Sequence, residues 1–287
     1  ALGLRDEGGN LNINWKPKAW IAILLGIILQ AFTFLYLNRP RLFGLYFFLS
    51  CIVSLIDWKY QTLFAAIFSI ICPIHAYIVV KNFEGSSERG WYSKWWGIPA
   101  IYVVFFSTVF LFRSFLYEPF LFPSASMQPT IDKGNHLIVK KLGYRTYGTN
   151  GVSLAGGEIA SPELMQRGKL YAFYPPHKEV PFVNRLIALP GDRIVVKGND
   201  ITINGAVLAT NLLYEKDQLV VYEQQLGGIT YLIQRMKMLP SRDMEEIVVP
   251  EGSYFFMGDN RDNSADSRFW GYVSSDSIIG EVVYVFK

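Results

Sequence analysis

The chain has 287 residues, of which 51% are hydrophobic and only 18% charged, and its net charge is +3. A soluble domain typically carries about 25% charged residues, so this composition excludes two ordinary soluble domains as well as disordered, collagen-like and coiled-coil chains. The small net charge argues against nucleic-acid binding. Residues 1–117 hold 10 basic and 5 acidic side chains, whereas residues 118–287 hold 17 and 19. The sequence therefore predicts a membrane domain over residues 1–117 and a domain outside the bilayer over residues 118–287.

Four runs in the first part lack charged residues and predict transmembrane helices. A helix needs about 20 apolar residues to cross the hydrocarbon core, with a range of roughly 17–25. The second run is short for a crossing, so both three and four crossings remain open. His75 lies in the third run and is expected to make a helix–helix contact. The expected helices cover residues 19–38, 42–57, 60–80 and 95–115.

The basic residues of the first part indicate an orientation. With four crossings, the two loops that carry Arg39 with Arg41 and Lys81 with Arg89 and Lys94 hold five positive charges, against four on the opposite side. Loops rich in Lys and Arg stay in the cytoplasm. This narrow margin favours a multi-pass protein with residues 118–287 outside the cytoplasm and with the lipid bilayer as a partner.

The second part has the period-two pattern of β-strands. No helical segments of 10–15 residues alternate with these strands, which excludes a doubly wound α/β domain. Residues 144–167 are rich in Gly, Ser and Thr and predict an irregular surface insertion. The expected fold class is a membrane-anchored, mostly-β chain, with transmembrane helices followed by an antiparallel β-rich domain. The expected strands cover residues 136–139, 170–173, 193–196, 201–203, 218–225, 229–233, 247–249, 254–256 and 281–286.

Cysteine and histidine usage argues against a disulfide or a metal in the β-rich domain. The two cysteines, Cys51 and Cys72, both lie in apolar runs of the first part. The three histidines, His75, His136 and His177, do not have the spacing of zinc ligands. The sequence predicts neither a metal site nor a cofactor.

Ser124 and Ser126 lie on a Pro-bounded segment that follows the last apolar run. Residues two apart on an extended segment face the same way. A serine beside a backbone N–H and a second hydroxyl has the composition of a nucleophile next to an oxyanion hole. Taken alone, however, Ser-x-Ser between prolines is typical of a loop.

A polar stretch near the C-terminus, residues 258–268, combines short polar side chains with two arginines. Such side chains hydrogen-bond to their own backbone and build compact turns. Arg261 and Arg268 are expected to pair with Asp259, Asp262 or Asp266. A calcium loop is disfavoured, because the arginines repel a cation and no Glu stands at the closing position.

Together, three segments resemble the bacterial type I signal peptidases, in that family's order and spacing. The first resembles the nucleophile box, the second the box that begins at the catalytic lysine, and the third the C-terminal box. The resemblance covers most of residues 110–287 and leaves residues 1–95 uncovered. The segments are residues 124–130, 185–192 and 258–273.

The resemblance implies an inner-membrane serine endopeptidase that removes signal peptides from exported preproteins, after small residues at −1 and −3, on the periplasmic side. It implies a Ser–Lys dyad with Ser126 as nucleophile. The backbone N–H of Ser126 and the hydroxyl of Ser124 would form the oxyanion hole, and Ser264 would orient the general base. Two ion pairs would support the site, Asp266 with Arg268 and Asp259 with Arg185.

The sequence departs from the family at the base, because Asn184 stands where the lysine is expected. An amide does not accept a proton at ordinary pH, and a general base contributes about 10²–10⁴ in rate. Lys178 is six residues upstream, roughly 20 Å along an extended strand, and His177 is no closer. His136 could reach the site, although a structural histidine is the simpler interpretation. Ala125, where glycine is common, is a smaller departure.

Three interpretations follow from Asn184. The chain is a signal peptidase whose lysine was replaced, a catalytically silent paralogue that binds preproteins without cutting them, or an active variant that uses another base. A conjugative-transfer peptidase of the same fold is a variant in substrate. A channel or transporter would need ionisable residues inside the spans, where only His75 occurs. An apolar patch that dips into lipid is also expected, from Leu116, Phe120, Leu121 and Phe122.

Overall fold

The computed structural model describes residues 15–83, 89–144, 146–149, 152–198, 200–239 and 243–286. The chain divides into two compact units, Ala1–Ser107 and Thr108–Lys287. The division falls inside α5 (Gly97–Phe115), close to the predicted boundary at residue 117.

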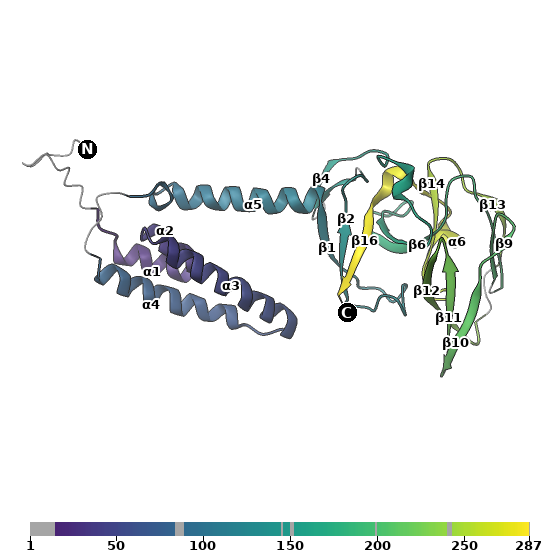
Figure 1. The fold of residues 1–287 in the computed structure, drawn as a ribbon, viewed down its shortest axis with the longest axis horizontal. Helices are drawn as coiled ribbons and strands as arrows, with labels where there is room; N and C mark the ends of the chain where they lie inside the picture. Colours follow the sequence, from purple (N-terminus) through teal and green to yellow (C-terminus); the bar gives the residue numbers. More distant parts are fainter. Residues whose placement is uncertain are drawn as a thin grey trace, which may run out of the picture. The chain divides into compact units, whose positions relative to one another are not determined.

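The first unit is helical (Figure 1). Three stretches, Pro40–Tyr60, Phe64–Lys81 and Gly97–Phe115, are long and apolar enough to cross a membrane. They correspond to the predicted helices at 42–57, 60–80 and 95–115. The elements before α5 are α1 (Ala19–Ile28), η1 (Gln30–Phe32), α2 (Thr33–Tyr36), α3 (Pro40–Tyr60), η2 (Phe64–Ile67), α4 (Phe68–Lys81) and η3 (Trp91–Ser93).

The expectation of one continuous helix over residues 19–38 was wrong. A straight helix would separate residues 22 and 33 by about 16 Å, but Thr33 Oγ1 donates a hydrogen bond to the Ala22 carbonyl at 2.8 Å. The chain turns back at Gln30, whose φ is +46°. As a result, the ring of Tyr36 contacts that of Trp15, with centroids 6.0 Å apart. The α1 helix is therefore the first arm of a helical hairpin. The second arm brings the chain back to the end of the unit where α1 begins.

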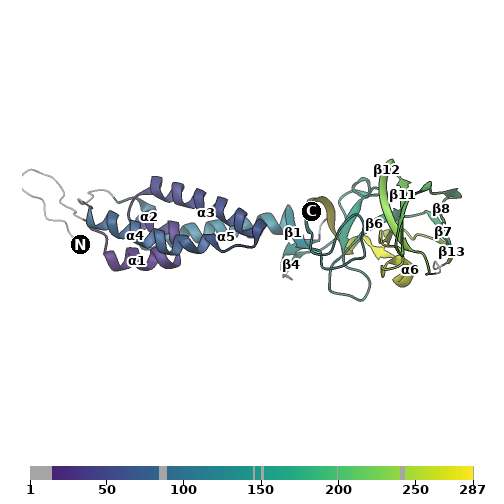
Figure 2. The ribbon, with the colours of Figure 1, turned by 90° about the horizontal axis from the view of Figure 1, so that it is seen from below.

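Close packing explains why α1 stays beside α4 (Figure 2). A Cβ on Gly26 would lie 2.7 Å from the Cα of Pro73, so only glycine allows this approach. Two residues after Pro73 on α4, His75 Nδ1 lies 2.7 Å from the hydroxyl of Tyr46 on α3. His75 thus makes the predicted helix–helix contact.

The second unit is an antiparallel β-rich domain, as the alternating pattern predicted. A seven-stranded sheet has the order β1-β2-β16-β5-β6-β14-β15, and smaller sheets are formed by β10-β11-β12, β13-β7-β8-β9 and β3-β4. The strands are β1 (Tyr117–Leu121), β2 (His136–Lys140), β3 (Tyr147–Thr149), β4 (Val152–Ala155), β5 (Leu170–Phe173), β6 (Phe182–Ala188), β7 (Arg193–Lys197), β8 (Asp200–Ile203), β9 (Ala206–Val207), β10 (Thr210–Lys216), β11 (Leu219–Leu226), β12 (Ile229–Met236), β13 (Met244–Val248), β14 (Ser253–Met257), β15 (Val273–Ser274) and β16 (Ile278–Phe286), with the short helices η4 (Pro162–Leu164), α6 (Ser267–Trp270) and η5 (Ser275–Ser277).

The sequence pattern missed the strands that matter most for the site. The β1 strand contains Pro119, and proline is tolerated there because β1 is an edge strand that pairs only with β2 in the described part of the chain. The β6 strand lies between β5 and β14 and is buried from Val183 to Ala188. A strand that is buried on both faces does not alternate, so period two is absent from its sequence.

The predicted surface insertion at residues 144–167 is partly anchored in the core. It contains the β3–β4 hairpin and η4. The side chain of Tyr144 is fully buried, and Met165 is 3% exposed. Both pack in one apolar cluster with Tyr171, Phe173 and Phe256.

Candidate active site

The segment that carries Ser124 and Ser126 leaves the sheet at the end of β1. The segment was predicted to be extended, but the structure shows a run of turns over residues 125–130. Phe122 and Met127 are buried on either side of the two serines and hold the segment against the sheet. The turn still brings the serines together, because the N–H of Ser126 donates to Ser124 Oγ at 3.1 Å. Both proposed oxyanion donors therefore lie at one point, with Ser124 exposed and Ser126 half-buried.

Asn260 fixes the backbone of this turn, a role that was not predicted from the sequence. Its N–H donates to the Ser126 carbonyl at 3.0 Å, and its Nδ2 donates to the Ala125 carbonyl at 3.0 Å. Asn260 is only 2% exposed. Two hydrogen bonds from one buried residue orient the peptide units on both sides of Ser126.

Asn184 lies on β6, is 1% exposed, and faces the same region. In one orientation of its amide, Nδ2 lies 3.4 Å from Ser264 Oγ and 3.9 Å from Met127 Sδ. With the amide turned over, its nitrogen donates to the Val183 carbonyl at 3.2 Å and its oxygen accepts from the Gly258 N–H at 3.0 Å. In both orientations the side chain is held between the nucleophile turn and the polar C-terminal stretch.

Gly258 provides the space in which these segments meet. A Cβ built on it would lie 2.2 Å from Ser264 Oγ and 2.6 Å from the Ser126 carbonyl oxygen. Both distances are too short for any real Cβ, so a side chain at 258 would push Ser264 and the nucleophile turn apart. Only glycine permits this approach, and the reason is close packing rather than an unusual backbone angle.

Arg185 and Asp259 form a buried ion pair beneath the site. Arg185 Nε donates to Asp259 Oδ1 at 2.8 Å and its Nη2 donates to Oδ2 at 2.5 Å, while Thr130 donates to the same carboxylate at 2.5 Å. The guanidinium also lies 3.9 Å from the ring centre of Tyr231. Burial by itself lowers the pKa of Arg185, but the charge and hydrogen bonds of Asp259 outweigh it, so the pKa is raised.

Asp266 and Arg268 form the second expected ion pair. Arg268 Nε donates to Oδ1 at 2.8 Å and Nη2 donates to Oδ2 at 2.8 Å, so the pair is bidentate. Oδ2 also accepts the N–H of Gly258 at 2.9 Å. This carboxylate therefore fixes the residue on which Ser126 and Ser264 converge.

Among the residues that the structure describes, Arg261 forms no ion pair with an aspartate, contrary to the expectation from sequence. Its side chain is fully enclosed, its Nε donates to the Gly258 carbonyl at 3.1 Å, and its Nη2 donates to Gln224 Oε1 at 2.7 Å. Burial is the main cause that lowers its pKa, and the nearby charge of Arg268 contributes. Arg261 acts as a structural brace for the backbone at Gly258.

The three groups considered as substitute bases are exposed or have neighbours other than the two serines. Lys178 is exposed, and its Nζ lies 4.8 Å from the ring centre of Phe182 and 5.6 Å from that of Trp270. His136 lies on β2 opposite Leu121 and Phe286. His177 is exposed, with a φ of +62°. The sequence-predicted site residues that do converge are Ser124, Ser126, Asn184, Arg185, Asp259, Ser264, Asp266 and Arg268.

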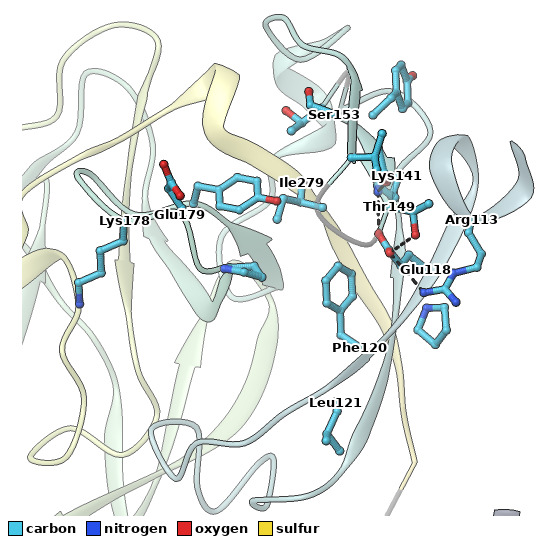
Figure 3. Close-up of a pocket in the computed structure, with 17 residues that line it drawn as sticks. Arg113, Glu118, Phe120, Leu121, Lys141, Thr149, Ser153, Lys178, Glu179 and Ile279 are labelled. Carbon is cyan, nitrogen blue, oxygen red and sulfur yellow. Dashed lines mark hydrogen bonds and ion pairs between the residues drawn. The ribbon is translucent and has the colours of Figure 1, made fainter. Parts of the chain in front are cut away.

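A cavity of about 660 Å³ lies beside β1 (Figure 3). Phe120 and Leu121 on β1 line it, as does Pro181 just before β6. Phe120 and Leu121 lie a few residues before Ser126 in the chain, and Pro181 lies a few residues before Asn184. A buried polar cluster borders the cavity, in which Glu118 accepts from Lys141 Nζ at 2.8 Å and also from Thr149. The described lining of the cavity thus includes part of β1 and the residue before β6, but none of Ser124, Ser126, Asn184 and Ser264.

Comparison with known proteins finds one family. Residues 94–287 match the model of the family described as signal peptidase, peptidase S26. A signal peptidase I of Pseudomonas aeruginosa is 34% identical over 203 residues, covering 62% of this chain and 67% of that protein. A signal peptidase IB of Staphylococcus aureus is 28% identical over 188 residues, covering 64% and 84%. A solved signal peptidase I from Enterococcus faecalis V583 is 27% identical, with a TM-score of 0.29, and the match covers 43% of this chain and 100% of that one.

Proposed function

The chain belongs to the signal peptidase family, peptidase S26, and we propose that its catalytic site is built from Ser126, position 184 and Ser264. By family it is a serine endopeptidase that removes signal peptides from preproteins. One observation carries the assignment of the site. Ser126 and Ser264 meet at Gly258, and Ser264 also contacts Asn184, although the three residues come from distant parts of the chain.

Cleavage at this site begins when Ser126 Oγ attacks the carbonyl carbon of the scissile peptide bond. The carbonyl oxygen becomes an oxyanion, which the N–H of Ser126 and the hydroxyl of Ser124 stabilise. The C–N bond then breaks and the leaving amine takes up a proton. Water releases the acyl group from Ser126 in a second step. A base beside Ser126 must accept the serine proton and later return it.

Asn184 removes that base from the site. Its amide does not accept a proton at ordinary pH, and in either orientation its hydrogen-bond partners are neutral groups. We therefore expect the chain to bind signal peptides but to turn them over about 10²–10⁴ times more slowly than a chain with a lysine at position 184.

The free edge of β1 is the proposed binding site for the substrate backbone. In the described part of the chain, β1 pairs only with β2, so the N–H and C=O groups on its other side remain available. An extended peptide that adds to this edge would run toward Ser124 and Ser126. The cavity beside Phe120 and Pro181 would hold its side chains.

The proposed topology has three crossings, by α3, the η2–α4 stretch and α5. The backbone N–H of Lys18 donates to the hydroxyl of Tyr36 at 2.9 Å, and Arg89 lies 4.3 Å from the ring centre of Trp15. The start of α1, the start of α3 and the loop before α5 therefore share one end of the unit. The basic residues at that end are Lys16, Lys18, Arg39, Arg41, Lys81, Arg89 and Lys94, while Lys59 belongs to the other end.

Because loops rich in Lys and Arg stay inside, this basic end would be cytoplasmic. The α5 helix begins there, so its far end and the β-rich unit would be outside. The hairpin at Gln30 supports this orientation, because it brings the N-terminal basic residues to the same side as the basic loops. Protease added to intact spheroplasts should digest the β-rich unit. Digestion only after lysis would contradict this orientation.

A lipid-facing patch is proposed on strands β1 and β16 of the large sheet. Leu121 and Tyr117 on β1 are exposed, as are Tyr284 and Phe286 on β16. Phe122, which was expected in this patch, is instead buried in the core and 6% exposed. Leu116 and Phe120, which were also expected there, are half-buried. Tyr117 and Leu121 come soon after the end of α5, so they would lie near the bilayer surface.

The test of the proposed site is to supply the missing amine in the full chain in detergent. We expect Asn184→Lys to increase preprotein cleavage at least about 10²-fold, the lower bound for a positioned general base. Asn184→Gln is the matched control, because it lengthens the side chain without adding a base. Adding Ser126→Ala to Asn184→Lys should abolish the gain.

Two results would contradict this proposal. Rapid, Ser126-dependent cleavage by the unmodified chain would show that another group, such as His136, acts as the base. Specific binding of a preprotein without any gain from Asn184→Lys would favour a silent binding paralogue instead.

A further inference from the structure

A second cavity, of about 600 Å³, lies in the helical unit where α3 begins and α4 ends. Asn38, Arg39, Arg41, His75 and Asn82 form its polar wall. Leu42, Ile78 and Val79 form its apolar wall. None of the described residues that line it is acidic, and none belongs to the cavity beside β1. The cavity therefore combines two positive charges with apolar surface.

Both arginines are available to a ligand. Within the described residues, neither Arg39 nor Arg41 forms an ion pair with a carboxylate. Arg39 instead lies 5.9 Å from the ring centre of Phe83. Both side chains are exposed. Guanidinium groups bind phosphate through paired hydrogen bonds, a geometry that two arginines at one cavity favour.

The first turn of α3 adds further positive potential to the same cavity. The helix has 21 residues, begins with Pro40, and has no side chain that caps its N-terminus. The amide N–H groups of a first turn have no partner within the helix. The helix dipole also favours an anion at this end. The arginines and the helix terminus thus favour the same kind of ligand.

The position of the cavity in the helical unit indicates that a lipid head group would supply the anion. Pro40–Tyr60 and Phe64–Lys81 are both apolar enough to cross a membrane, and the cavity lies where the first begins and the second ends. Such a position corresponds to the level of lipid head groups. A zwitterionic lipid would bring an ammonium group, for which no acidic side chain is present among the described lining residues. An anionic lipid has no such requirement.

We propose that this cavity binds an anionic phospholipid, with its phosphate between Arg39 and Arg41 and an acyl chain along Leu42, Ile78 and Val79. The site lies in the helical unit, and the serine site lies in the β-rich unit. The lipid would anchor the junction between the re-entrant hairpin and α3, and it would be retained when the protein is extracted from the membrane.

The test uses the full chain in a neutral maltoside detergent, with dioleoyl phosphatidylglycerol as the probe and native mass spectrometry to count bound lipid. We expect phosphatidylglycerol to bind at least about tenfold more tightly than phosphatidylcholine. The double variant Arg39→Gln/Arg41→Gln should weaken that binding at least about tenfold, since at least one charge-assisted hydrogen bond is lost. The double variant Lys81→Gln/Lys94→Gln removes the same charge from residues outside the cavity lining and should weaken binding less than about threefold.

A further double variant distinguishes loss of the binding site from misfolding. Arg39→Lys/Arg41→Lys keeps both charges but not the paired geometry, so its affinity should be intermediate, with an unchanged helical circular dichroism spectrum. Equal losses in the two Gln double variants would overturn the proposal, because they would indicate a general surface charge. Equal binding of phosphatidylcholine, or of soluble sn-glycerol phosphate at the same concentration, would also overturn it.

Discussion

Ser264 Oγ lies 3.4 Å from Asn184 Nδ2, although 80 residues separate the two in the chain. The contact places a hydroxyl beside the end of a buried side chain at position 184. A longer amine at this position would find an acceptor already in place. This relationship makes the role of Ser264 testable in a chain to which the base has been returned.

We expect Ser264→Ala, made in the Asn184→Lys chain, to lower preprotein cleavage by about 10- to 100-fold, since a misplaced catalytic group loses rate of that order. The acid limb of the pH–rate profile should also move, because the hydroxyl would no longer contact the amine. Ser264→Thr should recover part of the rate. An exposed serine on β15, Ser274, serves as the control through Ser274→Ala. A lower rate with an unmoved pH profile would indicate a purely structural residue.

Gly258→Ala should disrupt the site by crowding it. Its new methyl group would lie 2.2 Å from Ser264 Oγ, and overpacking of this kind costs about 1–3 kcal/mol in the free energy of unfolding. Gly156→Ala is a matched control, because no atom lies within 4 Å of the Cβ that it would add. The control should change the free energy of unfolding by less than about 0.5 kcal/mol. Equal unfolding transitions in urea for the two variants would contradict the packing argument.

Asp259→Asn should be strongly destabilising, because it leaves the Arg185 guanidinium buried without a counter-charge. Removing one partner of a buried pair costs about 3–5 kcal/mol. The exposed pair of Arg193 and Glu246 offers the control, and Glu246→Gln should cost at most about 1 kcal/mol. If Asp259→Asn does not fold, the double variant Arg185→Met/Asp259→Leu should recover folding, since it removes both charges. Similar costs for the buried and exposed pairs would refute the argument.

Asp192 should make the β-rich unit less stable in acid. Burial by itself would raise its pKa, but hydrogen bonds from Arg167, the Leu189 N–H and Asn204 outweigh it, so the pKa lies below the ordinary 3.8. With the folded pKa below the unfolded one, the stabilisation is complete above the unfolded pKa and is lost as the pH falls through the folded pKa.

The Asp192→Asn variant should therefore flatten the pH dependence of the unfolding free energy between about pH 5 and pH 2. Asp200→Asn, at an exposed position on β8, is the control. The measurement is urea unfolding of the full chain in detergent at each pH. An unchanged slope in Asp192→Asn would show that other carboxylates are responsible for it.

Most of the site was predictable, because its residues stand in short segments with a characteristic order. Ser126, Asn184 and Ser264 were placed together by resemblance, and the structure brings them to one point. Asn260 and Gly258 were missed as individual contributors. Their roles depend on which backbone atoms approach them, and no local pattern reports that.

Arg261 shows the same limit from the opposite direction. Its sequence neighbours Asp259 and Asp262 suggested an ion pair, but the side chain turns inward to Gln224 and the Gly258 carbonyl. Charge proximity along the chain predicts possible partners, and only the fold selects among them. The pair of Arg185 and Asp259, 74 residues apart, was expected from the resemblance and not from charge proximity.

The sequence by itself determined the division into an apolar helical part and a β-rich part, the family, and the absence of the lysine, because composition, alternation and motif order are local properties of the chain. Tertiary structure decided that residues 19–38 turn back at Gln30, which places the basic residues at one end. It also decided that β1 is an edge strand and β6 a buried one. These features depend on long-range packing, such as Gly26 against Pro73, whose energy comes from residues far apart in the sequence.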